Sequence, residues 1–119
     1  MKILVVDDSK AMRMIVKRTL KKAGLEGYDV VEASDGVEAL SVVKADKPDL
    51  ILCDWNMPNM SGLELLRVLR NSDNDIPFGF VTSESTPEMR QIAEHAGASF
   101  FISKPFTAAT FADRIGSVI

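Results

Sequence analysis

Short apolar runs of three to five residues alternate along the chain with longer segments in which apolar side chains recur every three or four positions. A continuous, partly β-branched run is typical of a strand that is buried on both faces of a sheet. The longer spacing indicates a helix with one apolar face. The strands predicted in this way are Ile3–Val6, Tyr28–Glu32, Leu50–Cys53, Phe78–Val81 and Phe100–Ile102.

The segments between these runs carry signals for the start and the end of helices. Residues Asp35–Glu38 and Ser61–Glu64 each resemble a capping box. Pro87 suits the first turn of a helix, and Gly24 suits the residue that follows one. The apolar positions with helical spacing are Met12, Ile15, Val16, Leu20 and Ala23; Leu65, Leu66 and Leu69; Met89, Ile92, Ala93 and Ala96; and Phe111, Ile115 and Val118.

Five strands that alternate with five helices predict an α/β sandwich around a parallel sheet. For five such units we expect a flavodoxin-like (βα)5 doubly wound fold with the strand order 2-1-3-4-5. Ligands of such sheets bind at the carboxyl ends of the strands, where the strand order reverses between strands 1 and 3. The pattern therefore predicts where on the fold the functional residues lie.

The composition narrows the class of protein. A chain of 119 residues suits one domain, so we expect residues 1–119 to form a single domain with no output domain attached. The net charge of −3 argues against a nucleic-acid-binding surface, and the single cysteine excludes an internal disulfide framework. The sequence has no apolar run of about 18 residues, and its first apolar run, Ile3–Val6, is too short for a signal peptide and leads directly into acidic residues. We therefore expect a cytoplasmic protein that does not interact with membranes.

Polar side chains directly follow four of the predicted strands. Asp7 and Asp8 follow the first strand, Asp54 the third, Thr82 the fourth and Lys104 the fifth. Because parallel strands end at the same edge of a sheet, we expect these residues to meet. Three carboxylates in one cleft repel one another unless their pKa values rise or a cation joins them. An all-oxygen site of this kind favours Mg²⁺.

With Mg²⁺ bound, one carboxylate could act as a nucleophile toward phosphorus and become an aspartyl phosphate. Asp54 is the better candidate, because it stands alone and leaves Asp7 and Asp8 to hold the metal. Lys104 and the hydroxyl of Thr82 could each stabilise charge on a phosphoryl oxygen.

These residues resemble the five-point signature of response-regulator receiver domains. The stretches Asp54–Leu66 and Lys104–Thr110 look especially similar to stand-alone chemotaxis-type (CheY-like) members. The resemblance implies a two-component signalling switch in which Asp54 accepts a phosphoryl group from a sensor histidine kinase. It is thus expected to be a switch and not an enzyme that turns over, although it would phosphorylate and dephosphorylate itself.

The resemblance also implies a role for each residue of the site. Asp8, Asp54 and the backbone carbonyl of Asn56 would ligate Mg²⁺, and Asp7 would act largely through water. Lys104 would contact the phosphoryl group and precede a cis proline, Pro105.

Thr82 and Phe101 would move together on phosphorylation, while Asn56 and Glu84 would tune the lifetime of the phosphoaspartate. The fourth helix, the fifth strand and the fifth helix would form the face that meets a downstream protein. That protein could be a flagellar motor switch component, and a phosphatase is a further possible partner. We expect the protein to be a monomer.

Two positions depart from the family pattern. Phe101 stands where chemotaxis members often have tyrosine, so a signal that needs a hydroxyl is lost there. Gly79 interrupts the apolar run before Thr82 and predicts a less regular fourth strand.

Other interpretations of the same residues stay open. The protein could be a phosphorelay regulator outside chemotaxis. A phosphohydrolase with an aspartyl nucleophile is less favoured, because such enzymes typically have a second acid where this chain has Asn56. A flavin-binding module is disfavoured because Asp7 and Asp8 would repel an anionic phosphate after the first strand. Residues Asp7, Asp8 or Ser9 could also simply cap the first helix.

Overall fold

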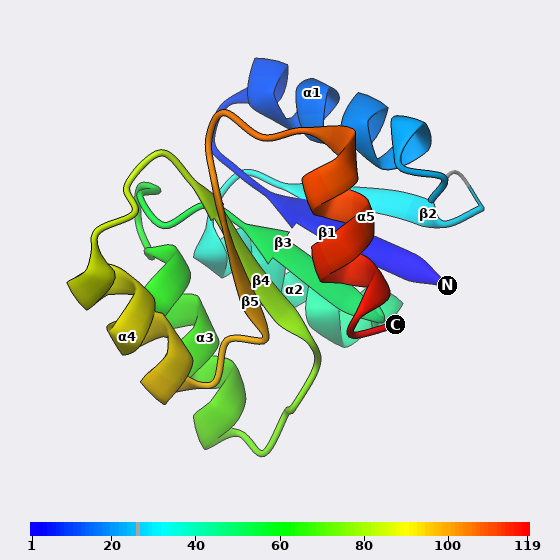
Figure 1. The fold of residues 1–119 in the computed structure, drawn as a ribbon. Helices are drawn as coiled ribbons and strands as arrows, with labels where there is room; N and C mark the ends of the chain where they lie inside the picture. The colour runs from blue at the N-terminus through cyan, green and yellow to red at the C-terminus, as the bar shows by residue number, and fades with distance from the viewer. Residues whose placement is uncertain (26) are drawn as a thin grey trace.

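The computed structural model describes residues 1–25 and 27–119 and shows strands and helices in strict alternation (Figure 1). The strands are β1 (Lys2–Val6), β2 (Asp29–Ala33), β3 (Leu50–Cys53), β4 (Phe78–Thr82) and β5 (Phe100–Ser103). The helices are α1 (Lys10–Lys22), α2 (Gly36–Asp46), α3 (Gly62–Asn71), α4 (Pro87–Ala96) and α5 (Ala108–Gly116).

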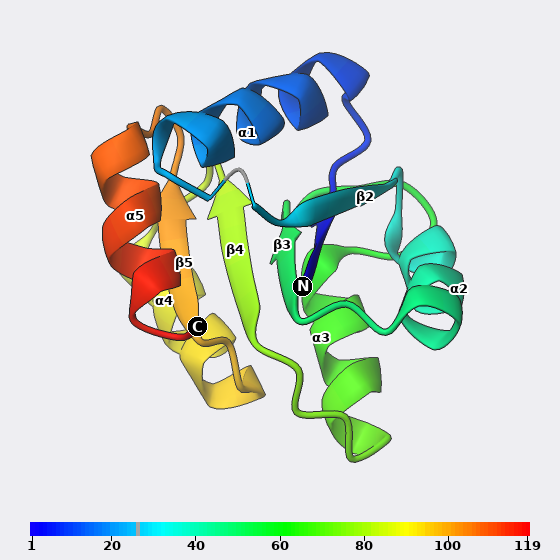
Figure 2. The same ribbon diagram turned by 90° about the vertical axis from the view of Figure 1, so that its right-hand side faces the viewer.

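The five strands form one parallel sheet in the order β2-β1-β3-β4-β5, which confirms the predicted flavodoxin-like topology. Helices α1 and α5 cover one face of the sheet, and α2, α3 and α4 cover the other (Figures 1 and 2). Among the described residues, no helix combines the length and the apolar character that a membrane span requires.

The sheet divides the hydrophobic core into two clusters, one under each layer of helices. Along β1, Leu4 and Val6 belong to the cluster beneath α2, α3 and α4, whereas Ile3 and Val5 belong to the cluster beneath α1 and α5. This alternation explains why the central strands are continuously apolar in sequence. Each fully buried side chain of this size stabilises the fold by roughly 1.5–3 kcal/mol.

Every helix begins at a side chain that accepts a hydrogen bond from the backbone N–H three residues later. The capping residues are Ser9, Asp35, Ser61, Thr86 and Thr107. The predicted capping box of Ser61 and Glu64 is confirmed, because both of its hydrogen bonds are present. The second predicted box is only half right, since the carboxylate of Glu38 accepts from the hydroxyl of Ser34 at 2.7 Å.

The prediction of a less regular fourth strand is wrong. Strand β4 is buried throughout and pairs in parallel with both neighbours. A Cβ atom at Gly79 would lie 2.0 Å from the ring of Phe100 on β5, so glycine here makes room for an aromatic side chain. The strand also includes Thr82, one residue more than expected, which fixes the position of that side chain.

Candidate functional site at the carboxyl edge of the sheet

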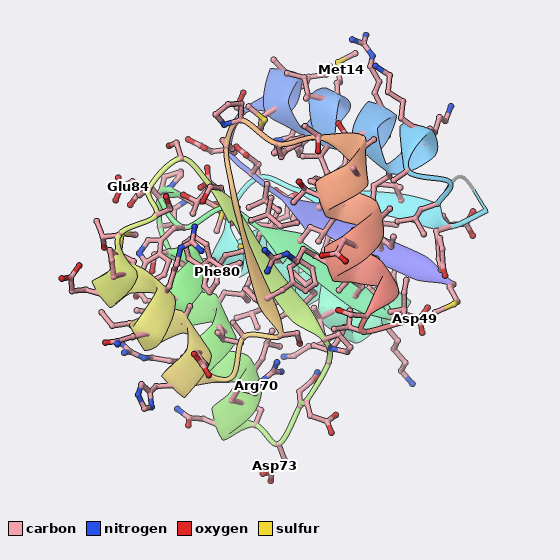
Figure 3. The ribbon with its side chains drawn as sticks, in the orientation of Figure 1. Met14, Asp49, Arg70, Asp73, Phe80 and Glu84 are labelled. Atoms are coloured by element: carbon pink, nitrogen blue, oxygen red, sulfur yellow. The ribbon has the colours of Figure 1, made fainter. Side chains whose placement is uncertain are left out.

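The polar residues that follow the strands meet at one edge of the sheet, as the topology requires. In Figure 3, Glu84 lies on the loop at this edge, and Asp49, which precedes β3, lies at the opposite edge. The ends of β1 and β3 are joined directly, because the N–H of Asp54 donates to the carbonyl of Val6 at 2.9 Å. The N–H of Asp7 likewise donates to the carbonyl of Ala33 at the end of β2.

Lys104 links two of these carboxylates. Its ammonium nitrogen lies 3.2 Å from Oδ2 of Asp7 and 3.3 Å from Oδ2 of Asp54. Only 15% of the Lys104 side chain is exposed, so these ion pairs are largely shielded from solvent. Folding thus places one cation between two acids that are 97 and 50 positions away in sequence.

Asp8 completes an acidic cluster with Asp7 and Asp54. Each residue offers a carboxylate oxygen, and these oxygens all lie within 4.8 Å of one another. Burial raises the pKa of Asp7 above its ordinary value, and the nearby charge of Asp54 acts in the same direction. The N–H of Ser9 and the ammonium of Lys104 lower it only in part. The cluster therefore carries a net electrostatic cost that a further cation would relieve.

The donor set of this cluster suits Mg²⁺. All three side chains offer oxygen, and burial increases from the exposed Asp8 to the buried Asp7, so an ion held there would keep a solvent-facing side. Mg²⁺ binds through one or two carboxylates and retains several waters, which it can exchange for phosphate oxygens.

The carboxylate of Asp54 is held at both oxygens. Its Oδ1 accepts the N–H of Trp55 at 2.7 Å, and its Oδ2 faces Lys104. Helix α3 begins close behind it, and a Cβ atom at Gly62 would lie 2.2 Å from the carbonyl oxygen of Asp54. Glycine at that position allows the helix to support the loop that carries Asp54.

Thr82 and Lys104 are joined through the backbone, where the N–H of Lys104 donates to the carbonyl of Thr82 at 2.8 Å. The buried hydroxyl of Thr82 accepts the N–H of Glu84 at 3.3 Å. The peptide bond between Lys104 and Pro105 is cis, as the resemblance implied.

Asn56 and Glu84 join the loops that follow β3 and β4, since the side-chain amide of Asn56 donates to the Glu84 carboxylate. Phe101 lies further along the same side of the sheet. It is half-buried, and its ring centroid lies 5.8 Å from that of Phe80 and 6.4 Å from that of Trp55.

Sequence reasoning missed Arg13, which supports the acidic loop. Its guanidinium donates to the carbonyl of Asp7 and to the carboxylate of Glu32, the latter at 2.9 Å. The available signal was its spacing, because Arg13 precedes Val16 and Leu20 by three and seven positions on the sheet-facing side of α1. The helix itself is capped by Ser9, and Asp7 and Asp8 therefore remain with the acidic cluster.

Comparison with known proteins agrees with this geometry. Residues 3–116 match the family described as the response regulator receiver domain. The chain belongs to this family. A Vibrio cholerae protein named chemotaxis protein CheY-3 is 39% identical over 120 residues, which cover 99% of this chain and 91% of that protein. Response regulator MprA of Mycobacterium avium is 37% identical over 119 residues, which cover 100% of this receiver domain and 51% of MprA.

Solved structures show the same likeness. The structure of chemotaxis protein CheY4 of Vibrio cholerae is similar to this receiver domain with a TM-score of 0.86 and 37% sequence identity, and the match covers 99% of this chain and 98% of that one. The chain is therefore a CheY-like receiver domain of the kind that two-component systems use.

Proposed function

We propose that this receiver domain accepts a phosphoryl group on Asp54 from the phosphohistidine of a sensor histidine kinase and signals through its α4–β5–α5 face. The observation that supports this most strongly is the position of Lys104, whose ammonium lies between Asp7 and Asp54 beside Asp8. Such a cluster would combine a nucleophilic carboxylate, a metal-binding acid pair and a fixed cation at one edge of the sheet.

In the reaction, a carboxylate oxygen of Asp54 forms the new P–O bond while the P–N bond of the donor histidine breaks. The imidazole nitrogen leaves with the electron pair of that bond. Lys104 is placed to neutralise charge on one phosphoryl oxygen, because its ammonium already faces Oδ2 of Asp54 at 3.3 Å. The hydroxyl of Thr82, which accepts from Glu84, keeps its own hydrogen to donate to a second oxygen.

Asp8, Asp54 and the backbone carbonyl of Asn56 would hold Mg²⁺ directly, and Asp7 would hold it through water. Bound Mg²⁺ supplies charge neutralisation between the carboxylates and the phosphoryl oxygens. The raised pKa of Asp7, which burial and the charge of Asp54 cause despite Lys104, is consistent with a site that one further cation would stabilise.

Signal output would follow from a change in the equilibrium between two conformers. Thr82 would move toward the phosphoryl group, and Phe101 would rotate inward with it, which would alter the face formed by α4, β5 and α5. The Vibrio cholerae relatives are named chemotaxis proteins, which supports a target in chemotaxis such as a flagellar motor switch component.

The signal would end when water hydrolyses the phosphoaspartate at Asp54. Asn56 and Glu84, which touch each other beside Asp54, would set how readily water reaches the phosphoaspartate. Self-dephosphorylation, or the action of a phosphatase, would end the signal, and the protein would not turn over phosphodonor continuously. We place this switch in the cytoplasm as a monomer that acts by protein–protein contact.

Intact-protein mass spectrometry tests the proposal. Incubation with acetyl phosphate and Mg²⁺ is expected to add one phosphoryl group to the native chain, and EDTA is expected to prevent it. Asp54→Asn removes the nucleophile with little change in shape, and Asp75→Asn makes the same change at an exposed acid outside the site. A phosphoryl gain that persists in Asp54→Asn, or sustained release of phosphate over many turnovers, would contradict the proposal.

The output is tested separately by capturing partners with phosphorylated and unphosphorylated protein. We expect at least one partner, a chemotaxis protein, to bind in a phosphorylation-dependent way. Identical partners in both states would argue against a switch.

A further inference from the structure

The cation–aromatic contact between Arg90 and Phe101 lies on the surface between α4 and β5. The guanidinium carbon of Arg90 lies 5.3 Å from the centroid of the Phe101 ring. Its Nη2 also donates to the hydroxyl of Ser103 at 2.9 Å. Phe101 and Ser103 are two positions apart on β5, so their side chains leave the same face of the strand. One side chain of α4 is thus fixed to both.

An aromatic stack connects this contact to the phosphoacceptor. The ring of Trp55 lies 4.9 Å from that of Phe80, and the ring of Phe80 lies 5.8 Å from that of Phe101. Phe80, labelled in Figure 3, is fully buried in the core beneath α2, α3 and α4. At the other end of the stack, the N–H of Trp55 donates to Oδ1 of Asp54 at 2.7 Å. The stack is a continuous packed path from Asp54 to Arg90.

The hydrogen bond to Ser103 decides how Arg90 responds when the ring moves. Because the guanidinium is also bonded to β5, it cannot follow Phe101 inward without breaking that bond. Inward rotation of Phe101 therefore loses a contact that exists only in the half-buried position. A contact made in one conformer and not in the other shifts the equilibrium between them.

We propose that Arg90 is a positioning residue that latches Phe101 in its half-buried position and thereby sets how much phosphodonor is needed to reach the phosphorylated conformer. This inference rests on the proposed function and adds a restraint that acts from the output face. The latch opposes the switch, so its removal makes the switch easier.

The test is a titration with acetyl phosphate at fixed Mg²⁺, followed by the fluorescence of Trp55, the chain's single tryptophan. For Arg90→Gln, the half-saturating concentration is expected to fall about two- to fivefold, the factor that an exposed cation–π contact supports. Arg90→Lys retains a cation with a less suitable shape, so its half-saturating concentration should lie between those of the native protein and Arg90→Gln. Arg67→Gln makes the same charge change on the exposed surface of α3 and should match the native protein.

A second set of variants separates the latch from a general charge effect. In a Phe101→Leu background, Arg90→Gln should have no further effect, because the ring that it holds is absent. The inference is overturned if Arg90→Gln leaves the titration unchanged, if its effect persists without the ring, or if Arg67→Gln reproduces it. Mass spectrometry of the same samples distinguishes a failure of the Arg90 proposal from a failure of the proposed function. A native chain that gains no phosphoryl group contradicts the proposed function itself, and the Arg90 proposal with it.

Discussion

Replacement of Asp7 by asparagine should stabilise the metal-free protein while weakening its response to Mg²⁺. Asparagine retains a carbonyl oxygen that can accept the N–H of Ser9, which now donates to Oδ1 of Asp7 at 2.9 Å. It removes a charge from a residue that is only 4% exposed. The substitution therefore isolates the electrostatic cost of the cluster from its packing.

The magnitude follows from the charges around Asp7. At an effective dielectric constant of about 20, Lys104 at 3.2 Å attracts the carboxylate by about 5 kcal/mol. A like charge at the cluster's limit of 4.8 Å repels it by about 3.5 kcal/mol. Asp54 and the solvent-screened Asp8 together offset most of the attraction from Lys104, and burial is added to the cost. We expect Asp7→Asn to raise the free energy of unfolding by about 1–2 kcal/mol in EDTA.

The raised pKa of Asp7 predicts how the stability gained in Asp7→Asn depends on pH. The folded pKa of Asp7 lies above its ordinary value of 3.8, chiefly because of burial, so the ionised form opposes folding. Above the folded pKa the full cost is present, and it declines as the pH falls through that pKa toward 3.8. The stability difference between Asp7→Asn and the native protein should therefore be constant near neutral pH and vanish in acid.

Urea unfolding measures this difference in EDTA and in Mg²⁺. Mg²⁺ should stabilise the native chain through preferential binding to the folded state and should stabilise Asp7→Asn much less. Asp75→Asn, at an exposed acid, should stay within about 0.5 kcal/mol of the native protein in both conditions. A loss of stability in Asp7→Asn under EDTA, or an undiminished response to Mg²⁺, would refute the electrostatic account.

Three further predictions concern the surroundings of Asp54. Gly62→Ala should destabilise the fold by about 1–3 kcal/mol in urea unfolding, because its Cβ would lie 2.2 Å from a carbonyl oxygen. Gly116→Ala, where a Cβ meets nothing within 4 Å, should instead be neutral or stabilising. Cys53 should resist iodoacetamide until urea unfolds the chain, since burial and the charges of Asp54 and Asp7 raise its pKa well above the ordinary value; rapid labelling of the folded protein would contradict its burial. Substitution of Asn56 by alanine should change the decay rate of the phosphoaspartate, followed by mass spectrometry, without abolishing its formation; an unchanged decay would remove Asn56 from that role.

The topology could be predicted because β1, β3 and β4 are buried on both faces and read as apolar runs in the sequence. The positions of Asp7, Asp54 and Lys104 followed from the same reasoning, since each directly follows a strand of a parallel sheet, and Thr82 ends such a strand. Local chemistry could be predicted where both partners are close in sequence, as in the capping box that starts α3.

The rest depends on which side chains meet across the fold. In the sequence, Gly79 indicates a weak strand. In the structure, glycine is required there because the ring of Phe100, on the neighbouring strand β5, occupies the space that a Cβ atom would need. The contacts of Arg13 with the Asp7 loop and of Arg90 with Phe101 likewise join elements whose relative positions no local pattern encodes. Long charged side chains resemble ordinary solvated residues in sequence, and only packing assigns them a role.

The most direct test of the account is to locate the phosphoryl group after reaction with acetyl phosphate and Mg²⁺. Borohydride reduces an aspartyl phosphate to homoserine, which tandem mass spectrometry assigns to a single position. We predict homoserine at Asp54 alone, and none when EDTA replaces Mg²⁺. Homoserine at Asp7, at Asp8 or at an acid outside the cluster would contradict the assignment of Asp54 as the phosphoacceptor.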